Sequence, residues 1–377
     1  MKRPRYVAFV GDATDPATFS GFPYHLVKSG QSLGVITGGL PLGHTVRFKS
    51  ARVIWNAVQL LTTGKYGGHQ YTEGAMRALW APVSEQISGS DLINIFQLYP
   101  EALWGRPDVR KWFYIDATLD QLFADYGTAN NYPRSFVADI ISRERAGYLR
   151  AEAVVCHSHW AAQSVVRDYG VSPAKVHVVL PGANIDEEAF SRWRPKKRGA
   201  ADGLSLVFVG REWRRKGLDR LLAAMQIAAR TNPAIRLKVV GCQEGDLPAE
   251  YRGVNRVDWV GRIDKQVDLP AFLDSIAQAD IGCLLSRAEC GGISLREFGA
   301  LGLGMLAPDV GGSPEHCPAG AAILVKPAAE PAEIARLLLD LASNPKRVAS
   351  LKRAAKKQSA DMLWRASLRK LDKILSI

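Results

Sequence analysis

The stretch of residues 286–315 constrains the fold of this chain more than any other. A short apolar run at residues 281–285 ends just before it, and the stretch then places Glu289 and Glu297 on either side of Gly291 and Gly292. This order is typical of a buried strand, a glycine turn and a helix. Because such a turn lies at the carboxyl end of a strand in an open parallel sheet, where ligands bind, we expect both carboxylates to point into one crevice.

The turn and the start of the helix offer hydrogen-bond donors to the same crevice. The backbone N–H groups of Gly291, Gly292, Ile293 and Ser294, together with the positive end of the helix dipole, suit an anionic or hydroxyl-rich ligand. Carboxylates accept paired hydrogen bonds from vicinal hydroxyls, as on a sugar or a ribose. Two glutamates separated by seven residues can also be a solvated pair on a surface helix, so the interpretation depends on the rest of the chain.

A second candidate binding loop precedes this stretch. Residues 204–209 read as a strand and Leu218 begins a helix, so Arg211 and Lys216 lie in the loop between them. Arg can bind a diphosphate through two hydrogen bonds and Lys can bind it as a point charge. A basic surface loop is the alternative, but two independent motifs at successive strand ends favour a binding site.

Strands and helices alternate along both halves of the chain, which predicts an α/β fold with a doubly wound parallel sheet in each half. The predicted strands of the first half are residues 6–10, 91–98, 111–115, 153–157 and 176–180. Those of the second half are residues 204–209, 236–241, 257–261, 281–285, 305–307 and 322–325. The 377 residues are enough for two domains, each with its own core.

The two loops together resemble known motifs. The Glu289 to Glu297 segment is similar to the E-x7-E signature, and the Gly210-Arg211 to Lys216-Gly217 loop is similar to the G-R-x(n)-K-G element, of retaining, nucleotide-sugar-dependent glycosyltransferases with the GT-B fold, family 4 (group 1). The resemblance is specific mainly over residues 209–315. It implies two Rossmann-like domains that face each other across a cleft and close on the donor by a hinge motion. The usual motif has an aromatic residue between its glycines, whereas this chain has Cys290-Gly291-Gly292.

The resemblance also implies a role for each candidate residue. Glu289 would contact the donor sugar, and Glu297 would contact the ribose. The backbone from Gly291 to Ser294 would contact the sugar and the phosphate. Arg211 and Lys216 would neutralise the diphosphate. The loop with Arg262 and Ile263 corresponds to the one whose backbone meets the nucleobase. Gly21, after the first strand, corresponds to a glycine at the domain crevice, with a plain tight turn as the alternative. Asp116, after the strand at 111–115, lies where relatives often have a histidine; it could orient an acceptor hydroxyl or simply cap the next helix.

The implied domain organisation follows the same comparison. We expect an acceptor-binding domain at residues 1–190, a linker at 191–203, a nucleotide-sugar-binding domain at 204–360 and a helix at 361–377 that crosses back to the first domain. The implied reaction moves a sugar, with retention, from a nucleotide-diphosphate donor to a hydroxyl of a glycan, lipid-linked or small-molecule acceptor. Two alternatives stay open: a GT-B sugar-nucleotide epimerase, and a noncatalytic nucleotide-sugar-binding partner of another transferase. No Asp-x-Asp triplet occurs, so a metal-bridged donor phosphate is not expected. The resemblance implies a nucleotide-diphosphate sugar as donor substrate and no cofactor.

The net charge of +12 is concentrated near the end of the chain, where residues 343–377 hold ten basic and two acidic residues. Such a tail can meet anionic lipid, nucleic acid or a phosphorylated substrate, or it can be a solvated helix face. No zinc-finger, RNP-type or basic-zipper pattern supports a nucleic-acid partner. A predicted helix at 44–61 with Arg47, Lys49 and Arg52, followed by a glycine and aromatic loop at 64–71, is a candidate for acceptor or membrane contact, with an ordinary packed helix as the alternative.

The sequence favours a cytoplasmic protein. No apolar run approaches the roughly twenty residues needed to span a bilayer, and the run at residues 6–10 is too short for a signal peptide. The cysteines lack paired spacing, which favours reduced thiols; they are Cys156, Cys242, Cys283, Cys290 and Cys317. Peripheral attachment to the inner face of the membrane is compatible with the basic segments. The nucleobase, sugar, acceptor and oligomeric state are left open.

Overall fold

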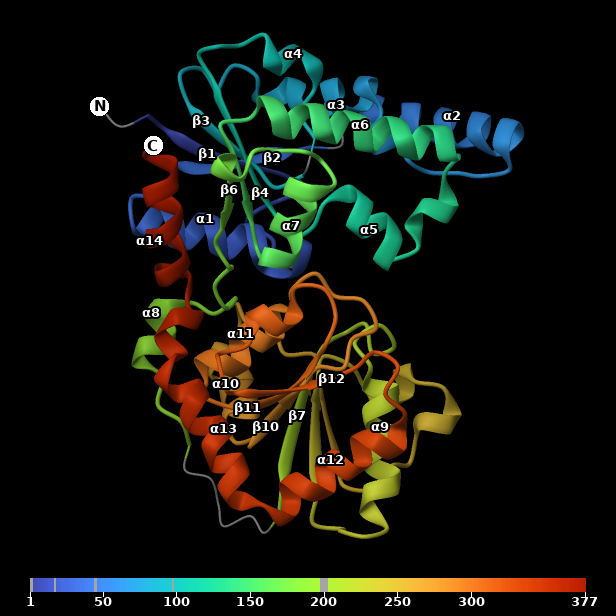
Figure 1. Ribbon diagram of the computed structural model, residues 1–377, viewed down its shortest axis with the longest axis vertical. Helices are drawn as coiled ribbons and strands as arrows, with labels where there is room; N and C mark the ends of the chain where they lie inside the picture. The colour runs from blue at the N-terminus through green and yellow to red at the C-terminus, as the bar shows by residue number, and fades with distance from the viewer. Residues whose placement is uncertain (1–2, 17, 44–45, 97, 197–202) are drawn as a thin grey trace. The chain divides into compact units, whose positions relative to one another are not determined.

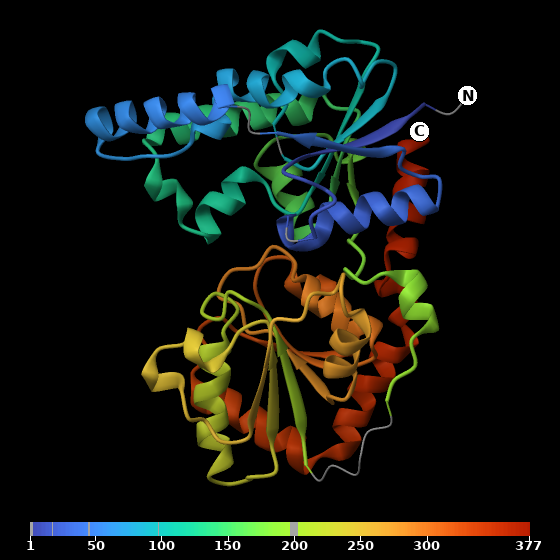
Figure 2. The same cartoon turned by 180° about the vertical axis from the view of Figure 1, so that it is seen from behind.

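The computed structural model describes residues 3–16, 18–43, 46–96, 98–196 and 203–377. The chain forms two compact units, one of Met1–Leu180 with Leu368–Ile377 and one of Pro181–Ser367. Each unit is built on its own six-stranded sheet (Figures 1 and 2). Much of the linker expected at 191–203 lies outside the described residues, and its start belongs to α8 (Glu187–Arg192).

The sheet of the first unit is entirely parallel, with the strand order β2-β1-β3-β4-β5-β6. Its strands are β1 (Arg5–Val10), β2 (Gly38–Leu42), β3 (Asp91–Asn94), β4 (Arg110–Ile115), β5 (Ala153–Cys156) and β6 (Val176–Val178). The chain passes from β1 to the edge strand β2 and then returns to the opposite side at β3. The strand order therefore reverses between β1 and β3, and such a reversal opens a crevice at the carboxyl ends of the strands.

Helices connect these strands. They are α1 (Phe22–Ser32), α2 (Val46–Thr63), α3 (Glu73–Trp80), α4 (Glu101–Trp104), α5 (Leu119–Asp125), α6 (Arg134–Arg150) and α7 (His159–Arg167). The final helix, α14 (Trp364–Leu375), ends in this unit, where Arg5 forms an ion pair with Asp372 and donates a 3.0 Å hydrogen bond to Ser376 Oγ. His44 and Thr45, where helix α2 was expected to begin, lie outside the described residues, as does the side chain of Arg47.

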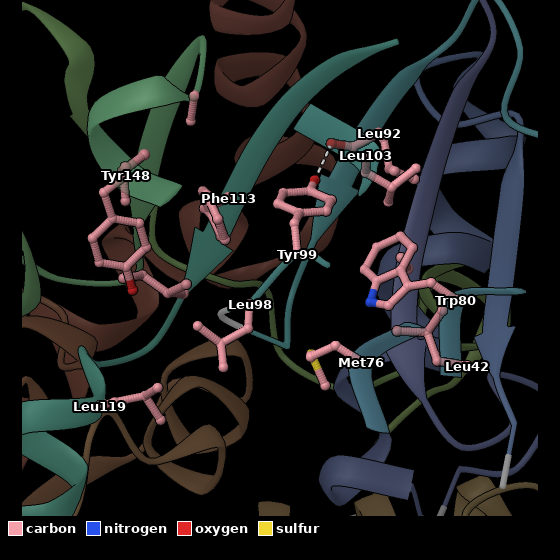
Figure 3. Close-up of a cluster of buried hydrophobic side chains, with 14 of the residues drawn as sticks. Leu42, Met76, Trp80, Leu92, Leu98, Tyr99, Leu103, Phe113, Leu119 and Tyr148 are labelled. Atoms are coloured by element: carbon pink, nitrogen blue, oxygen red, sulfur yellow. Dashed lines mark hydrogen bonds between the residues drawn. The ribbon is translucent and has the colours of Figure 1, made fainter. Parts of the chain in front are cut away.

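Aromatic rings form much of the first unit's core (Figure 3). Tyr99 lies between Trp80 and Phe113, with ring centroids 5.0 Å from each, and its hydroxyl contacts the backbone oxygens of Leu92 at 2.7 Å and Trp112 at 2.9 Å. Tyr148 of α6 packs edge-on against Phe113 at 4.9 Å. The core thus joins α3 and α6 to the middle of the sheet, and the buried Tyr99 hydroxyl is satisfied by the strands themselves.

The second unit has a parallel sheet with the order β12-β11-β10-β7-β8-β9. Its strands are β7 (Ser205–Val209), β8 (Arg236–Val240), β9 (Val257–Gly261), β10 (Ile281–Cys283), β11 (Gly304–Pro308) and β12 (Ala322–Val325). Helices α9 (Leu218–Ala229) and α12 (Pro331–Ser343) lie on one face, and α10 (Leu269–Ala277) and α11 (Ile293–Ala300) on the other (Figure 1). Helix α13 (Pro345–Lys357) packs its buried Val348 and Leu351 into the same core cluster as α9 and α12. The doubly wound parallel sheet predicted for each half is confirmed.

The strands predicted at 176–180 and 281–285 each end two residues early, at Val178 and Cys283, and two larger differences have structural causes. The strand predicted at 91–98 ends at Asn94, because the Asn94 side chain turns the chain: its amide donates to Leu98 O at 2.7 Å and its oxygen accepts from Phe96 N at 2.8 Å. Strand β2 was not predicted at all. Its sequence, GGLPL, has two glycines and a proline, which only an edge strand accepts readily, and β2 pairs with β1 alone.

Candidate functional site

The candidate site of the second unit lies where the strand order reverses. Strands β7 and β10 are neighbours, with Cys283 opposite Phe208, and the chain leaves β7 toward β8 on one side and β10 toward β11 on the other. The loops that follow β7 and β10 therefore flank the crevice in which doubly wound sheets bind ligands. These are the two loops that the sequence singled out.

Backbone hydrogen bonds join the two loops directly. Leu285 N donates to Lys216 O at 3.2 Å, and Arg287 N donates to Arg215 O at 3.0 Å. Gly217 lies at this junction with a φ of 74°, and a Cβ there would be 2.1 Å from Leu285 O, so no other residue fits without displacing the loops.

Two arginines reinforce the junction from the sides. Arg287 forms a bidentate ion pair with Asp219 of α9, at 3.0 and 2.7 Å. Arg220 donates to Leu285 O at 3.1 Å and to two carbonyls of the loop after β12, Lys326 O at 3.0 Å and Ala329 O at 2.9 Å. These guanidinium groups are already engaged, so they position the loops and leave ligand binding to other cations.

Glu289 is held in place by the first loop. Its carboxylate, 12% exposed, accepts hydrogen bonds from Arg215 Nη1 at 3.1 Å and from Ser286 Oγ at 3.1 Å. Arg215 Nη1 also donates to Ala288 O at 3.2 Å, and Arg215 Nε donates to Glu212 Oε2 at 2.6 Å. The carboxylate is therefore oriented before any ligand arrives, with accepting capacity remaining on its second oxygen.

The charges of both glutamates, Glu289 and Glu297, act on Lys216. Desolvation lowers the pKa of its half-buried ammonium; the charges of Glu289 and Glu297 oppose that shift, and those of Arg215 and Lys265 add to it. Within the described part of the chain, neither the Lys216 ammonium nor the exposed Arg211 guanidinium has a hydrogen bond or an ion pair. The site thus presents two cations, one of them partly dehydrated, that can bind an anion.

Glu297 comes from the helix that follows the glycine turn. It is buried on α11 and forms an ion pair with Lys265, whose ammonium lies 4.3 Å from the centroid of the Phe272 ring. Lys265 belongs to the loop after β9, which also carries the exposed Arg262 and the half-buried Ile263. A third loop is therefore tied to the site through Glu297.

The glycine turn precedes α11 as predicted, and Gly292 is the N-cap residue of that helix. Ser294, in the first turn, is buried, and its hydroxyl has no hydrogen-bond partner among the described residues. Gly312 N, in the loop after β11, donates to Cys290 O at 3.1 Å, and the ring of His316 packs on Gly291. The turn is thus supported from the neighbouring loop.

The two remaining candidates belong to the first unit. Gly21 is buried after β1 and is the N-cap residue of α1. Asp116 follows β4 directly and is half-buried. Thr118, which forms a capping box with Gln121, is the N-cap residue of α5, so Asp116 does not have the capping role that the sequence left open for it.

Sequence reasoning missed four residues that shape the site: Arg215, Lys265, Ser286 and His316. Arg215 could have been suspected, since it adjoins Lys216 in the basic run RRK. Ser286 lies in the same loop as its partner Glu289, but a single serine there gives no distinctive pattern. Lys265 and His316 carry no local signal, because their partners Glu297 and Gly291 belong to other segments of the chain. Within the described residues, no cluster of His, Cys, Asp and Glu that could hold a metal is found, and no helix is both long and apolar enough to cross a membrane.

The sequence matches two family models, Glycosyltransferase Family 4 over residues 25–187 and Glycosyl transferases group 1 over residues 190–358. D-inositol 3-phosphate glycosyltransferase 1 of Catenulispora acidiphila is 30% identical over 255 residues, which are 63% of this chain and 59% of that protein. The chain spans about half to three fifths of the length of the first curated relatives it matches.

Solved structures share the fold over nearly the whole chain. HepE of Anabaena, in complex with UDP and glucose, superimposes with a TM-score of 0.66 at 16% identity and covers 100% of both chains. Sucrose-phosphate synthase of Thermosynechococcus elongatus gives a TM-score of 0.65 at 16% identity and covers 99% of this chain and 98% of its own. With both halves matched by family models and the fold shared throughout, this chain belongs to the GT-B-fold glycosyltransferases of family 4 and group 1.

Proposed function

We propose that this protein transfers a sugar from a nucleoside diphosphate donor to an acceptor hydroxyl, with retention at the anomeric carbon and without a metal. The observation that carries the proposal is the meeting of the loops after β7 and β10, where the charges of Glu289 and Glu297 both act on the dehydrated ammonium of Lys216. Cations for a diphosphate and carboxylates for hydroxyls are thus gathered in one site, as a nucleotide sugar requires.

The cations would bind the part of the donor that becomes more negative as the bond to the sugar breaks. Arg211 has no competing partner among the described residues, and Lys216 is partly dehydrated, which strengthens its attraction for phosphate oxygens. Groups fixed in advance toward the developing charge stabilise a transition state without reorganisation. The backbone N–H groups from Gly291 to Ser294 would add donors at the start of α11.

The carboxylates would orient the sugar and the ribose. Glu289, held by Arg215 and Ser286, has a free oxygen lone pair for a sugar hydroxyl, and Glu297 would accept from the ribose. The backbone of Arg262 and Ile263 would meet the nucleobase. Asp116 and Gly21, in the first unit, would act on the acceptor side and at the donor crevice. Transfer would be a front-face substitution assisted by the leaving phosphate, with the enzyme supplying position and charge.

The comparisons suggest the first substrates to test. A structural neighbour binds UDP and glucose, which makes UDP-hexoses the first donors, with pentoses next. The relatives named for D-inositol 3-phosphate suggest a phosphorylated polyol as one acceptor, beside glycans and lipid-linked sugars. We further propose that residues 1–190 hold the acceptor, that residues 204–360 hold the donor, and that the protein works in the cytoplasm, in part at the inner face of the membrane.

A product assay tests the proposal. A panel of nucleoside diphosphates is first screened by thermal shift, since a ligand at 100 times its Kd stabilises the native state by about 2.7 kcal/mol. The matching labelled nucleotide sugars are then incubated with acceptors, and linkage and anomeric configuration are read by NMR. Glu289→Gln should lower turnover by about 100-fold or more, whereas Glu250→Gln, an exposed position in the same unit, should not. Nucleotide release without any acceptor-linked product, or full activity of Glu289→Gln, would contradict transfer.

A further inference from the structure

Helix α2 of the first unit exposes a stripe of large apolar side chains. Val53 is 66% exposed, Ile54 65%, Val58 50%, Leu60 56% and Leu61 85%. Side chains at positions 53, 54, 58 and 61 recur at helical spacing, so they lie along one side of the helix. The ordinary packed helix that the sequence allowed is therefore not what these residues form. A contiguous exposed apolar surface of this kind marks an interaction site.

The opposite side of α2 is firmly packed, so the exposure does not come from an undocked helix. Trp55 Nε1 donates to Gly67 O at 2.8 Å, and Asn56 Oδ1 accepts from Gly67 N at 3.0 Å. The Trp55 ring lies 5.5 Å from the ring of Phe136 on α6. These contacts fix which side of α2 faces outward.

An apolar groove continues the stripe. A cavity of about 560 Å³ lies between α2 and the segment that leads into α3, and Ile54 and Val58 belong both to its wall and to the exposed stripe. Its other lining residues are small or aromatic: Ala51, Trp55, His69, Thr72, Gly74, Ala75 and Ala78. A groove of this volume and character suits a stretch of hydrocarbon chain.

The charge of α2 indicates which apolar partner fits. The segment Val46–Thr63 contains three basic residues and no acidic one. Lys49 and Arg52 are exposed, and the Arg52 charge adds to the burial that lowers the pKa of His69. A surface that joins apolar side chains to cations alone complements an anionic bilayer, in which phosphates lie directly above hydrocarbon.

We propose that α2 and the groove beside it dock on an anionic lipid bilayer, with Val53, Ile54 and Leu61 entering the interface, Lys49 and Arg52 at the level of the phosphates, and the groove taking part of a lipid chain. Such a helix lies in the plane of the interface and buries its apolar side to a depth of about 5–10 Å. The inference uses the first unit alone, so it stands or falls separately from the proposed transferase site.

Vesicle flotation tests the docking. The full chain is mixed with vesicles of phosphatidylcholine alone or with 30% phosphatidylglycerol. We expect binding to the anionic vesicles that weakens as salt rises. Ile54→Ser with Leu61→Ser should lower partitioning at least tenfold, and Lys49→Glu with Arg52→Glu should abolish the preference for the anionic lipid. Val267→Ser is the matched control, because Val267 is 84% exposed in the second unit.

A second readout reports insertion directly. Leu61→Cys labelled with an environment-sensitive fluorophore should shift to the blue on anionic vesicles, whereas Val267→Cys labelled in the same way should not. Each of three outcomes would overturn the proposal: no vesicle binding by the wild type, equal effects of the α2 and Val267 changes, or loss of binding only when the basic residues of α13 and α14 are reversed. A change from dimer to monomer in the α2 variant, with vesicle binding intact, would instead identify the stripe as an interface between two copies.

Discussion

The imidazole ring of His316 lies where a side chain on Gly291 would begin. A Cβ on Gly291 would be 2.4 Å from Cε1 of that ring, 2.7 Å from Nε2 and 3.0 Å from Nδ1. His316 ends the short helix Ser313–His316 in the loop after β11 and is almost fully buried. The motif that this chain resembles has an aromatic side chain between its glycines. Here a ring from the neighbouring loop fills the space at Gly291 and supports the turn from outside.

Gly291→Ala should therefore destabilise the second unit and weaken donor binding together. The new methyl group must displace His316, and overpacking of this kind costs about 1–3 kcal/mol. Thermal unfolding and UDP titration measure the two effects. Adding His316→Ala should restore much of the stability and of the UDP affinity, since it removes the ring with which the new methyl group clashes. Gly245→Ala is the control, because a Cβ there meets nothing within 4 Å. If the double variant is no better than Gly291→Ala, the ring does not support the turn.

The sheet strands were largely predictable because buried parallel strands are short apolar runs, as at Phe208 and Val239. Strand β2 was not, since its glycines and proline give no apolar signal and only its edge position permits them. In the site, the loops after β7 and β10 were predictable from local order, and so were four of the charged residues: Arg211, Lys216, Glu289 and Glu297. The pairs that complete it, Lys265 with Glu297 and His316 with Gly291, join separate loops, and only the folded arrangement brings them together.

Substitutions of Lys265 and Glu297 should have strongly non-additive effects on the free energy of unfolding, because the two side chains form an ion pair. Lys265→Met leaves a buried carboxylate without its counter-charge. Because the lysine side chain is about a quarter exposed and water can replace part of it, we expect a loss of roughly 1–3 kcal/mol rather than the full value for a sealed pair. Glu297→Gln alone should also destabilise, while the double variant should lose less than the sum. Denaturant unfolding of all four proteins gives the coupling energy, and additive losses would show that the pair contributes nothing.

Lys216 should make nucleotide binding fall at alkaline pH. Burial lowers the pKa of this ammonium from the ordinary lysine value of 10.5, so it loses its proton at a lower pH than a surface lysine does. A diphosphate binds the protonated form, so affinity should be full below that pKa and decline as the pH rises through it, with proton uptake on binding just above it. Calorimetric titration of UDP from pH 7 to 10, in buffers of different ionisation enthalpy, measures the affinity and the number of protons taken up on binding.

A charge-preserving variant gives the comparison for that profile. Lys216→Arg keeps a cation that stays protonated throughout this range, so its UDP affinity should be nearly independent of pH even if it is weaker. Lys216→Met should lose about 1.5–3 kcal/mol of binding at pH 7, the contribution of a charged hydrogen bond. A pH profile of the wild type that matches that of Lys216→Arg would assign the alkaline decline to another group.

Glu144, buried in the first unit, should make that unit less stable as the pH rises. The carboxyl accepts from Leu119 N at 3.1 and 3.0 Å and is hydrogen-bonded to the hydroxyls of Tyr148, at 2.5 Å, and Tyr169. Burial raises its pKa to about 8, against the ordinary 4.5 of an unfolded chain, and the hydrogen bonds offset this only in part. Between these values the native state keeps a proton that the unfolded state releases. The free energy of unfolding therefore falls between about pH 4.5 and 8, by up to about 1.4 kcal/mol per pH unit, and levels off above that.

Glu144→Gln tests this, because an amide imitates the protonated carboxyl at every pH. The free energy of unfolding of the variant should not fall over this pH range. Its stability relative to the wild type should therefore increase steadily from pH 5 to 8. Hydrogen exchange at the Leu119 amide gives a local readout at the start of α5, and it avoids treating a two-unit chain as a single transition. Glu85→Gln, at an exposed position of the same unit, should keep the wild-type slope. Parallel pH profiles for wild type and Glu144→Gln would mean that this carboxyl is ionised in the native state, with the two tyrosine hydroxyls and the Leu119 amide sufficient to hold its charge.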